Sequence, residues 1–323
     1  MTENPQTVPA VAVETENLTK VFRDFWRRPK VVAVDGLDLK ILKGEVFGLL
    51  GPNGSGKSTT IKMLLGLLHP SSGTIRVLGA PPHEVRTKAR IGYLPEDSHL
   101  YSYLTARETL DFFARLFGMD GPTRRRRSGE LLEMVGLAQA ADRLVGEFSK
   151  GMARRIGLAQ ALINDPELLI LDEPTSGLDP IGCRQVKDLI LTLVKGGKSV
   201  ILSSHLLADV EDVCDRIAIL YNGRIRARGQ VRDLLERREQ MQLTLPSLPP
   251  EATAALLRLI REQIGHEPEV THPSMDLERF FIGVVAQAHS SPGASSGVSP
   301  TGGVAGYLRT EGDHEPRAEN EPC

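Results

Sequence analysis

The sequence predicts an α/β fold with a mostly parallel sheet, an N-terminal antiparallel β layer, a helical insert and a small C-terminal accessory region. Apolar runs at Val46–Leu50, Leu168–Leu171 and Val200–Leu202 are short enough to be single buried strands, and helical patterns separate them. Buried strands that alternate with helices indicate a parallel sheet. Residues 37–41 instead alternate between apolar and polar side chains, which predicts a strand with one solvated face near the N-terminus.

The composition is that of an ordinary globular protein. With 323 residues, 41% of them hydrophobic, the chain can bury a sizeable core in one large domain or two smaller ones. Its 39 basic and 41 acidic residues give a net charge of −2, so we expect no general attraction to nucleic acid. Three cysteines without metal-ligand spacing suggest a reducing compartment. We find no signal peptide and no bilayer-length apolar run, and expect a cytoplasmic location.

The first elements are expected to form the antiparallel layer. Residues 1–12 are polar and contain proline, so we expect a flexible N-terminus. Leu18–Phe22 and residues 37–41 predict two strands. The basic, aromatic loop Arg23–Pro29 between them predicts a hairpin tip, and it contains the only tryptophan.

A phosphate-binding loop is predicted between the strand that ends at Leu50 and the helical pattern that follows. Glycines allow backbone angles that other residues resist, and successive N–H groups at a helix start attract phosphate. Lys57 would neutralise the β- and γ-phosphates of a nucleotide, and Ser58 would give its hydroxyl to Mg²⁺. The pattern predicts a P-loop NTPase core. The loop comprises Gly51, Pro52, Asn53, Gly54, Ser55, Gly56, Lys57, Ser58 and Thr59.

The middle of the chain changes from strands to helices. Two strands are expected at Gly73–Gly79 and Ile91–Pro95. Thr105 and Glu108 then form a capping box before an amphipathic helical pattern, which predicts a helical insert in the α/β domain. The run Arg124–Arg127 is interpreted as a solvated surface, and we assign it no function.

Polar side chains follow the buried strands of the second half. Asp172 and Glu173 end one strand, and His205 follows another. The carboxyl ends of parallel strands form the ligand-binding edge of such a sheet, where Gly51 also falls. We therefore assign Asp172 to Mg²⁺ and Glu173 to polarising an attacking water. The alternative is a pair of helix-starting acids before Pro174.

The C-terminal part has a different pattern. Helical spacing of apolar residues recurs at 256–264 and again at 277–284, which predicts a small accessory unit. From Ser290 onward Ser, Gly and Pro dominate, which predicts disorder. The expected divisions are a flexible N-terminus at 1–12, an ATPase domain at 13–237 with its helical insert at about 97–162, an accessory region at 238–286 and a disordered tail at 287–323.

Five motifs in order resemble the ATP-binding subunit of an ATP-binding cassette (ABC) transporter. The resemblance covers residues 13–229. The motifs are Gly51–Thr59, Ser149–Met152, Leu168–Pro174, Ser176–Asp179 and Ser204–His205.

The resemblance implies roles for residues around the nucleotide. Phe22 would stack on adenine, and His205 would contact the γ-phosphate. Glu96 stands where the family usually has glutamine, at a position that senses Mg²⁺ and the attacking water and couples to the membrane subunit. For Arg23–Pro29, contact with adenine, ribose or a partner stays open beside a plain exposed turn.

The resemblance also implies a dimer. Ser149 and Gly151 would bind the γ-phosphate of ATP held by a second subunit, and Asp179 would lie across that interface. In the family this signature usually reads Leu-Ser-Gly-Gly-Gln, and three of its five positions differ here, at Phe148, Lys150 and Met152.

The expected function is that of an ATP-binding and ATP-hydrolysing subunit that dimerises on ATP and drives a separate transmembrane permease. Pro95-Glu96 and residues 276–281 are similar to exporter subunits that pair with type-2 permeases, so export is expected. The cofactors are ATP and Mg²⁺, the partners are the permease and a second copy, and no nucleic acid is expected. The location is the inner face of the cell membrane. The alternatives are a soluble ABC ATPase acting on ribosomes or nucleic acid, and a subunit that binds ATP without hydrolysis.

Overall fold

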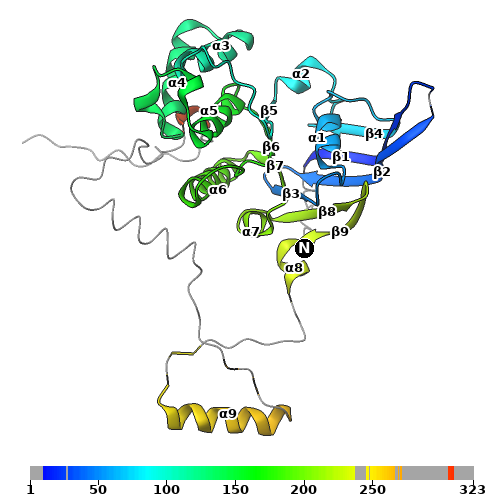
Figure 1. Ribbon diagram of the computed structural model, residues 1–323, viewed down its shortest axis with the longest axis vertical. Coiled ribbons are helices and arrows are strands. Elements are labelled where there is room, and N and C mark those ends of the chain that lie inside the picture. The colour runs from blue at the N-terminus through cyan, green and yellow to red at the C-terminus, as the bar shows by residue number, and fades with distance from the viewer. Residues whose placement is uncertain are drawn as a thin grey trace, which may run out of the picture. The chain divides into compact units, whose positions relative to one another are not determined.

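The chain divides into two compact units. The computed structural model describes residues 10–26, 28–236, 245–246, 248–265, 268, 270 and 305–308. The main unit comprises Met1–Leu234 together with Ser295–Cys323, and the second unit comprises Leu235–Ala294. Nearly all of the elements drawn in Figure 1 belong to the main unit.

An antiparallel sheet of three strands forms the N-terminal layer of the main unit. It has the order β2-β1-β4, with β1 at Val11–Arg23, β2 at Pro29–Leu42 and β4 at Ser72–Val77. The predicted layer is confirmed, and the aromatic loop is the tip of the β1–β2 hairpin. Both predicted strands are longer than expected, because the β1–β2 ladder continues past several bulges.

The second sheet has six strands and carries the parallel order that the sequence predicts. Its order is β5-β6-β7-β3-β8-β9, and all pairs except β8–β9 are parallel. The sequence prediction missed β9, an antiparallel edge strand that follows a tight turn at Asn222-Gly223. The bounds are β3 Val46–Leu50, β5 Ile91–Leu94, β6 Leu168–Asp172, β7 Ser199–Ser204, β8 Arg216–Tyr221 and β9 Arg224–Gln230.

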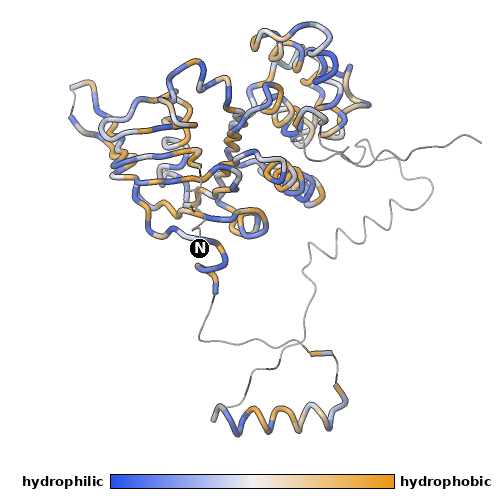
Figure 2. The backbone as a smooth tube through the Cα atoms, turned by 180° about the vertical axis from the view of Figure 1, so that it is seen from behind, coloured by the Kyte–Doolittle hydropathy of each residue, from blue (hydrophilic) through white to orange (hydrophobic). Residues whose placement is uncertain are grey.

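Two hydrophobic clusters lie on the two faces of this sheet. Strand alternation sends Leu169 and Leu171 of β6 into one cluster, and Leu168 and Ile170 into the other. The first cluster includes the helical insert and α6, and the second includes α1 and the antiparallel layer. Figure 2 shows hydrophobic residues along the central strands. The helices around the sheet are α1 Lys57–Leu64, α2 Val85–Lys88, α6 Pro180–Lys195, α7 Leu207–Glu211 and α8 Val231–Leu235.

The helical insert consists of α3 Ala106–Leu116, α4 Gly121–Met134 and α5 Lys150–Leu162, with short 3-10 turns at Ala138–Ala140 and Val145–Glu147. The predicted capping box is present. The Thr105 hydroxyl accepts from the Glu108 backbone N–H at 3.2 Å, and the Glu108 carboxylate accepts from the Thr105 N–H at 2.9 Å. The three helices gather on one side of the main sheet (Figure 1).

The second unit contains α9, Pro250–Ile264. This helix confirms the pattern predicted at 256–264, and Gly265 ends it in the left-handed conformation with φ of +77°. Figure 2 shows hydrophobic and hydrophilic stretches alternating along α9. The helix predicted at 277–284 lies outside the described residues. No helix in the described part of the chain is both long enough and apolar enough to cross a membrane.

A short C-terminal segment packs on the main unit, where the sequence predicts disorder. Ala305 and Leu308 are 4% and 1% exposed, and a 3-10 turn spans Gly306–Leu308. The Tyr307 hydroxyl donates to the Leu162 carbonyl of α5 at 3.1 Å. For Ala305–Leu308 the prediction is therefore wrong. The prediction used the composition of the whole tail, which is rich in Ser, Gly and Pro, so a short apolar segment within it was overlooked.

The arginine run takes part in this packing. Arg127 places its guanidinium 4.3 Å from the centre of the Tyr307 ring and donates to the Ile163 carbonyl at 3.0 Å. Arg124 binds Asp111 of α3 at 2.7 Å. Arg125 and Arg126 are exposed. The interpretation as a solvated run is therefore wrong for two of the four arginines, which face neighbouring elements because the run lies on a helix.

Replacing Leu308 by aspartate should lower the free energy of unfolding of the main unit. Leu308 is fully buried in the first hydrophobic cluster, so the change forfeits about 2 kcal/mol of apolar burial. Urea denaturation measures the loss. Leu67→Asp is the control, because Leu67 belongs to the same unit and is 64% exposed. Equal midpoints for the two variants would show that the docked segment contributes nothing to stability.

Candidate functional site

The loop between β3 and α1 has a backbone that only glycine can adopt at two positions. Gly51 and Gly56 have φ of +149° and +108°. A Cβ at Gly51 would lie 2.2 Å from the Leu220 carbonyl oxygen, and one at Gly56 would lie 2.5 Å from the Ala33 carbonyl oxygen. The loop is thus pressed against β8 and β2, and a larger residue at either position would displace it.

Lys57 is held by the loop itself. It is 6% exposed, and its Nζ donates to the carbonyls of Gly51 at 2.6 Å and Pro52 at 3.3 Å. These contacts point the ammonium group along the loop. Ser55 is also buried, and its hydroxyl has no hydrogen-bond partner within the described structure. The Ser55 hydroxyl can still donate a hydrogen bond, and Lys57 is positively charged, so the loop can bind an anion.

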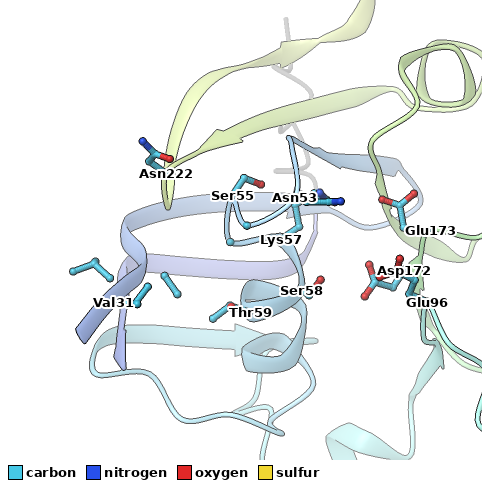
Figure 3. Close-up of a pocket in the computed structure, with 14 residues that line it drawn as sticks. Val31, Asn53, Ser55, Lys57, Ser58, Thr59, Glu96, Asp172, Glu173 and Asn222 are labelled. Carbon is cyan, nitrogen blue, oxygen red and sulfur yellow. The ribbon is translucent and has the colours of Figure 1, made fainter. Parts of the chain in front are cut away.

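A cavity of about 470 Å³ opens over this loop. Figure 3 shows Lys57 and Ser58 on one side of it and the carboxylates of Glu96, Asp172 and Glu173 facing them. The acids come from two adjacent parallel strands, since Glu96 follows β5, Asp172 ends β6 and Glu173 follows it. The residues that line the cavity are Val31, Val32, Ala33, Asn53, Gly54, Ser55, Gly56, Lys57, Ser58, Thr59, Glu96, Asp172, Glu173 and Asn222.

Asp172 is fixed by the neighbouring strand. It pairs with Ser203 of β7 in the parallel ladder, and the Ser203 hydroxyl donates to its carboxylate. Asp172 is 5% exposed, so its carboxylate lies at the buried end of the cavity. Lys57 of the loop lines the same cavity as this carboxylate.

Glu173 has an unusual backbone and a close histidine. Its φ is +51°, a conformation that is strained for a residue with a long side chain. Its backbone N–H donates to both the carbonyl and the hydroxyl oxygen of Ser203, at 3.1 and 3.2 Å. Its Oε2 lies 2.8 Å from Nδ1 of His205, while the His205 side chain stays 51% exposed. His205 thus reaches the site through Glu173 and is not among the described residues that line the cavity.

The aromatic residues of the β1–β2 hairpin lie outside the cavity lining in the described structure. Phe22 is 41% exposed and pairs across the hairpin with Val31, which does line the cavity. Lys20 places its ammonium 5.4 Å from the Phe22 ring. Phe25 and Trp26 are 92% and 71% exposed at the tip, as in the open-turn interpretation.

The cavity also contains residues that the sequence interpretation missed. Val31, Val32 and Ala33 of β2 form one wall, and Asn222 at the β8–β9 turn forms another. The Gly223 N–H donates to the Ser55 carbonyl at 3.0 Å, so this turn supports the loop. The Asn-Gly pair between alternating residues is a hairpin signal that could have located the turn. Its contact with the loop comes from the β3–β8 pairing, which the sequence does not reveal.

Comparison with known proteins identifies the family. The model of the ABC transporter family matches residues 34–176. Over 273 residues the chain is 43% identical to an uncharacterised ABC transporter ATP-binding protein of Synechocystis sp., and the match covers 84% of this chain and 76% of that protein. This chain is an ABC transporter ATP-binding protein. It is also 42% identical to the Nod factor export ATP-binding protein I of Burkholderia lata, over 71% of this chain and 74% of that one.

Solved structures of ABC cassettes have the same fold. The dimeric cassette MJ0796, bound to ADP and phosphate, is 26% identical with a TM-score of 0.63, and the match covers 68% of this chain and 99% of that one. CbiO1 from Clostridium perfringens, described as part of the transporter complex cbiONQ, is 25% identical with a TM-score of 0.62, over 79% and 96% of the two chains.

Three further predicted site residues of this ABC protein also lie away from its own cavity lining. Ser149 caps α5, and its hydroxyl accepts from the Met152 N–H at 3.2 Å. Gly151 lies in the first turn of the same helix, where a Cβ would meet Leu178 at 3.4 Å. Asp179 caps α6 by accepting from the Gly182 N–H at 3.0 Å. Within one chain, the structure does not bring these residues to the phosphate loop.

Proposed function

We propose that this ABC subunit hydrolyses ATP and uses the reaction to drive a separate permease in the direction of export. One observation carries the proposal. The phosphate loop and three carboxylates from two neighbouring strands face one another across a single cavity (Figure 3). A cation-lined loop binds the substrate phosphates, and the facing acids provide metal ligands and a base, which are the parts that phosphoryl transfer to water needs.

The loop is built to hold the nucleotide phosphates. Residues 53–59 line the cavity, and α1 begins there with its N-terminus toward the loop. Lys57 would exchange its contacts with the loop carbonyls for contacts with the β- and γ-phosphates. The unpaired Ser55 hydroxyl supplies a further donor. Phe22, at the rim beside Val31, is proposed to stack on adenine.

The donor set also fits Mg²⁺. The Ser58 hydroxyl and the carboxylates of Asp172 and Glu96 are hard oxygen ligands that line the same cavity, which is what this ion prefers. Mg²⁺ bound with the nucleotide would neutralise charge on the phosphates. The anchoring of Asp172 by Ser203 keeps its carboxylate turned toward this position.

Glu173 is proposed to polarise the attacking water. Its carboxylate is buried, lines the cavity and lies within hydrogen-bond distance of His205, whose Nδ1–H would keep it oriented. The exposed remainder of the His205 ring is free to reach the γ-phosphate. The Glu173 side chain lies across the cavity from the loop (Figure 3), where a water bound between the two would be within its reach.

A second copy is proposed to complete the site. Ser149 and Gly151 stand at the start of α5 and outside the cavity of their own chain, so they are available to the nucleotide of a partner. Two head-to-tail copies would each give one phosphate loop and receive one such helix, which is a closed two-fold arrangement. The dimeric state of the cassette MJ0796 supports this proposal.

The helical insert offers a surface for the permease. Tyr101, Tyr103 and Phe112 are 42%, 70% and 36% exposed and form one aromatic cluster, with ring centres 5.6 to 5.7 Å apart for the contacting pairs. Clustered exposed aromatics are typical of protein interfaces. The export direction rests on the name of the Burkholderia relative. We propose that the subunit acts at the inner face of the cell membrane.

Recovery of the tagged chain from its native membranes in mild detergent with Mg-ATP tests this function. We expect one multi-spanning membrane protein in the eluate and ATP hydrolysis by the complex. Tyr103→Ser with Phe112→Ser should abolish the recovery, whereas Phe25→Ser with Trp26→Ser, which removes two exposed aromatics from the hairpin tip, should not. Recovery of ribosomal proteins or nucleic acid in place of a membrane protein would overturn the transport function.

A further inference from the structure

Arg154 of α5 is a buried cation that binds main-chain oxygens. It is 5% exposed, and its hydrogen bonds within the described structure all go to carbonyl groups. Its Nε donates to Pro174 at 3.2 Å, its Nη1 to Pro95 and to Glu96 at 2.9 Å, and its Nη2 to Asp172 and to Glu173 at 2.6 Å.

These carbonyls belong to the two segments that carry the acids of the cavity. Pro95 and Glu96 follow β5, and Asp172–Pro174 end and follow β6, the strand paired with β5. Burial lowers the pKa of Arg154, and the nearby charges of Asp172, Glu96 and Glu173 oppose that shift. A planar guanidinium presents its N–H groups in a fixed fork, so it sets the spacing of both segments at once.

The strained backbone of Glu173 is held from both sides. Ser203 accepts from its N–H, and Arg154 donates to its carbonyl. A conformation with φ of +51° persists only where the surroundings determine it, so loss of either contact allows the side chain to turn away. Arg154 acts on the Glu173 carboxylate through the backbone, and its hydrogen bonds within the described structure go to main-chain carbonyls and not to the carboxylates of Glu96, Asp172 or Glu173.

We propose that Arg154 is a positioning residue for ATP hydrolysis, which makes the placement of Glu173 and Glu96 depend on the seating of α5. The inference rests on the proposed hydrolysis and deepens it. The helix that starts with Ser149 and Gly151 also carries Arg154 in its second turn, so movement of its start relative to β6 moves the hydrolytic glutamate of the same chain. The contact thereby links the helical insert to the water-activating group.

The test replaces Arg154 by lysine and by methionine. Lysine keeps the charge and loses the fork, and methionine loses both. We expect kcat for Mg-ATP hydrolysis to fall about 10-fold for Arg154→Lys and about 100-fold for Arg154→Met, since small displacements of a reacting group cost this much. The Kd for ATP should stay within about twofold, because Arg154 does not contact the phosphate loop. Arg155→Lys is the control, since Arg155 is also buried but binds Val135 and Gln185.

Two further readouts separate positioning from mere support of the fold. Combined with Glu173→Gln, Arg154→Lys should lower the remaining rate no further, because both changes remove the same contribution. Amide hydrogen exchange at residues 95–97 and 172–175 should accelerate in Arg154→Lys and not in Arg155→Lys. This exchange does not depend on hydrolysis. The role of Arg154 is overturned if amide exchange in Arg154→Lys is the same as in the wild type, or if Arg155→Lys loses as much kcat as Arg154→Lys. If the exchange accelerates in Arg154→Lys as expected but the wild-type chain hydrolyses no ATP, only the proposed function is overturned.

Discussion

Glu173→Gln should slow hydrolysis by about 100-fold or more and trap an ATP-bound dimer. In the wild type, His205 Nδ1 lies 2.8 Å from Glu173 Oε2. Glutamine has the same shape as glutamate and can accept the same hydrogen bond, so the cavity and the proposed metal ligands stay in place. It cannot polarise water as a carboxylate does, and loss of a general base costs about 100-fold or more in rate. Steady-state ATPase measurements and the molar mass of the protein in Mg-ATP check the two halves of the prediction.

Glu211→Gln is the matched control for this variant. Glu211 is an exposed acid on α7, the helix that follows His205, and it does not line the cavity. Its replacement should leave the rate and the mass unchanged. If Glu173→Gln remained monomeric with ATP and hydrolysed it at the wild-type rate, another group would have to activate the water.

Lys57→Ala should instead weaken ATP binding itself. Lys57 is the buried cation of the loop, and a charged hydrogen bond of this kind is worth about 1.5–3 kcal/mol, so Kd should rise about 10- to 100-fold. Isothermal titration with Mg-ATP measures the change. The variant also leaves the Gly51 and Pro52 carbonyls without their donor, so a modest loss of thermal stability should accompany it.

Lys62→Ala is the control, because it also removes a lysine from α1 but leaves Lys57 in place. Lys62 lies on the same helix and is exposed to solvent. It should bind ATP as the wild type does. Equal affinities for Lys57→Ala and the wild type would show that the phosphates do not sit on the ammonium group.

The sequence was sufficient to predict the parts of the site that follow strand ends. The β3–β7 register pairs Leu50 with Ser204, and the β6–β7 register pairs Asp172 with Ser203, so the loop and the acids come to one edge, as a parallel sheet requires. Local patterns also located the capping box of α3 and the helix α9. In each of these cases, the residues that decide the structure lie close together in the sequence.

Features that depend on contacts between distant segments were not predictable. Asn222 reaches the cavity because β8 pairs with β3, and the partner of Arg127 is Tyr307, far along the chain. His205 reaches the site through Glu173, a side-chain contact that no spacing shows. In the sequence, Arg154 cannot be distinguished from other basic residues on a helix. Its five carbonyl partners lie in two separate segments, residues 95–96 and 172–174.

The docking of Ala305–Leu308 also sets when the protein can finish folding on the ribosome. The strands of both sheets are complete once Gln230 has been synthesised, yet Ala305 and Leu308 belong to the core of the same unit. Residues 231–308 must be translated before Leu308 is available. At elongation speeds of about 5 to 20 residues per second, these residues take roughly 4 to 16 s. During that interval α4 and the end of α5 face solvent where Tyr307 later lies, so a nascent chain halted before Ala305 presents the uncovered patch.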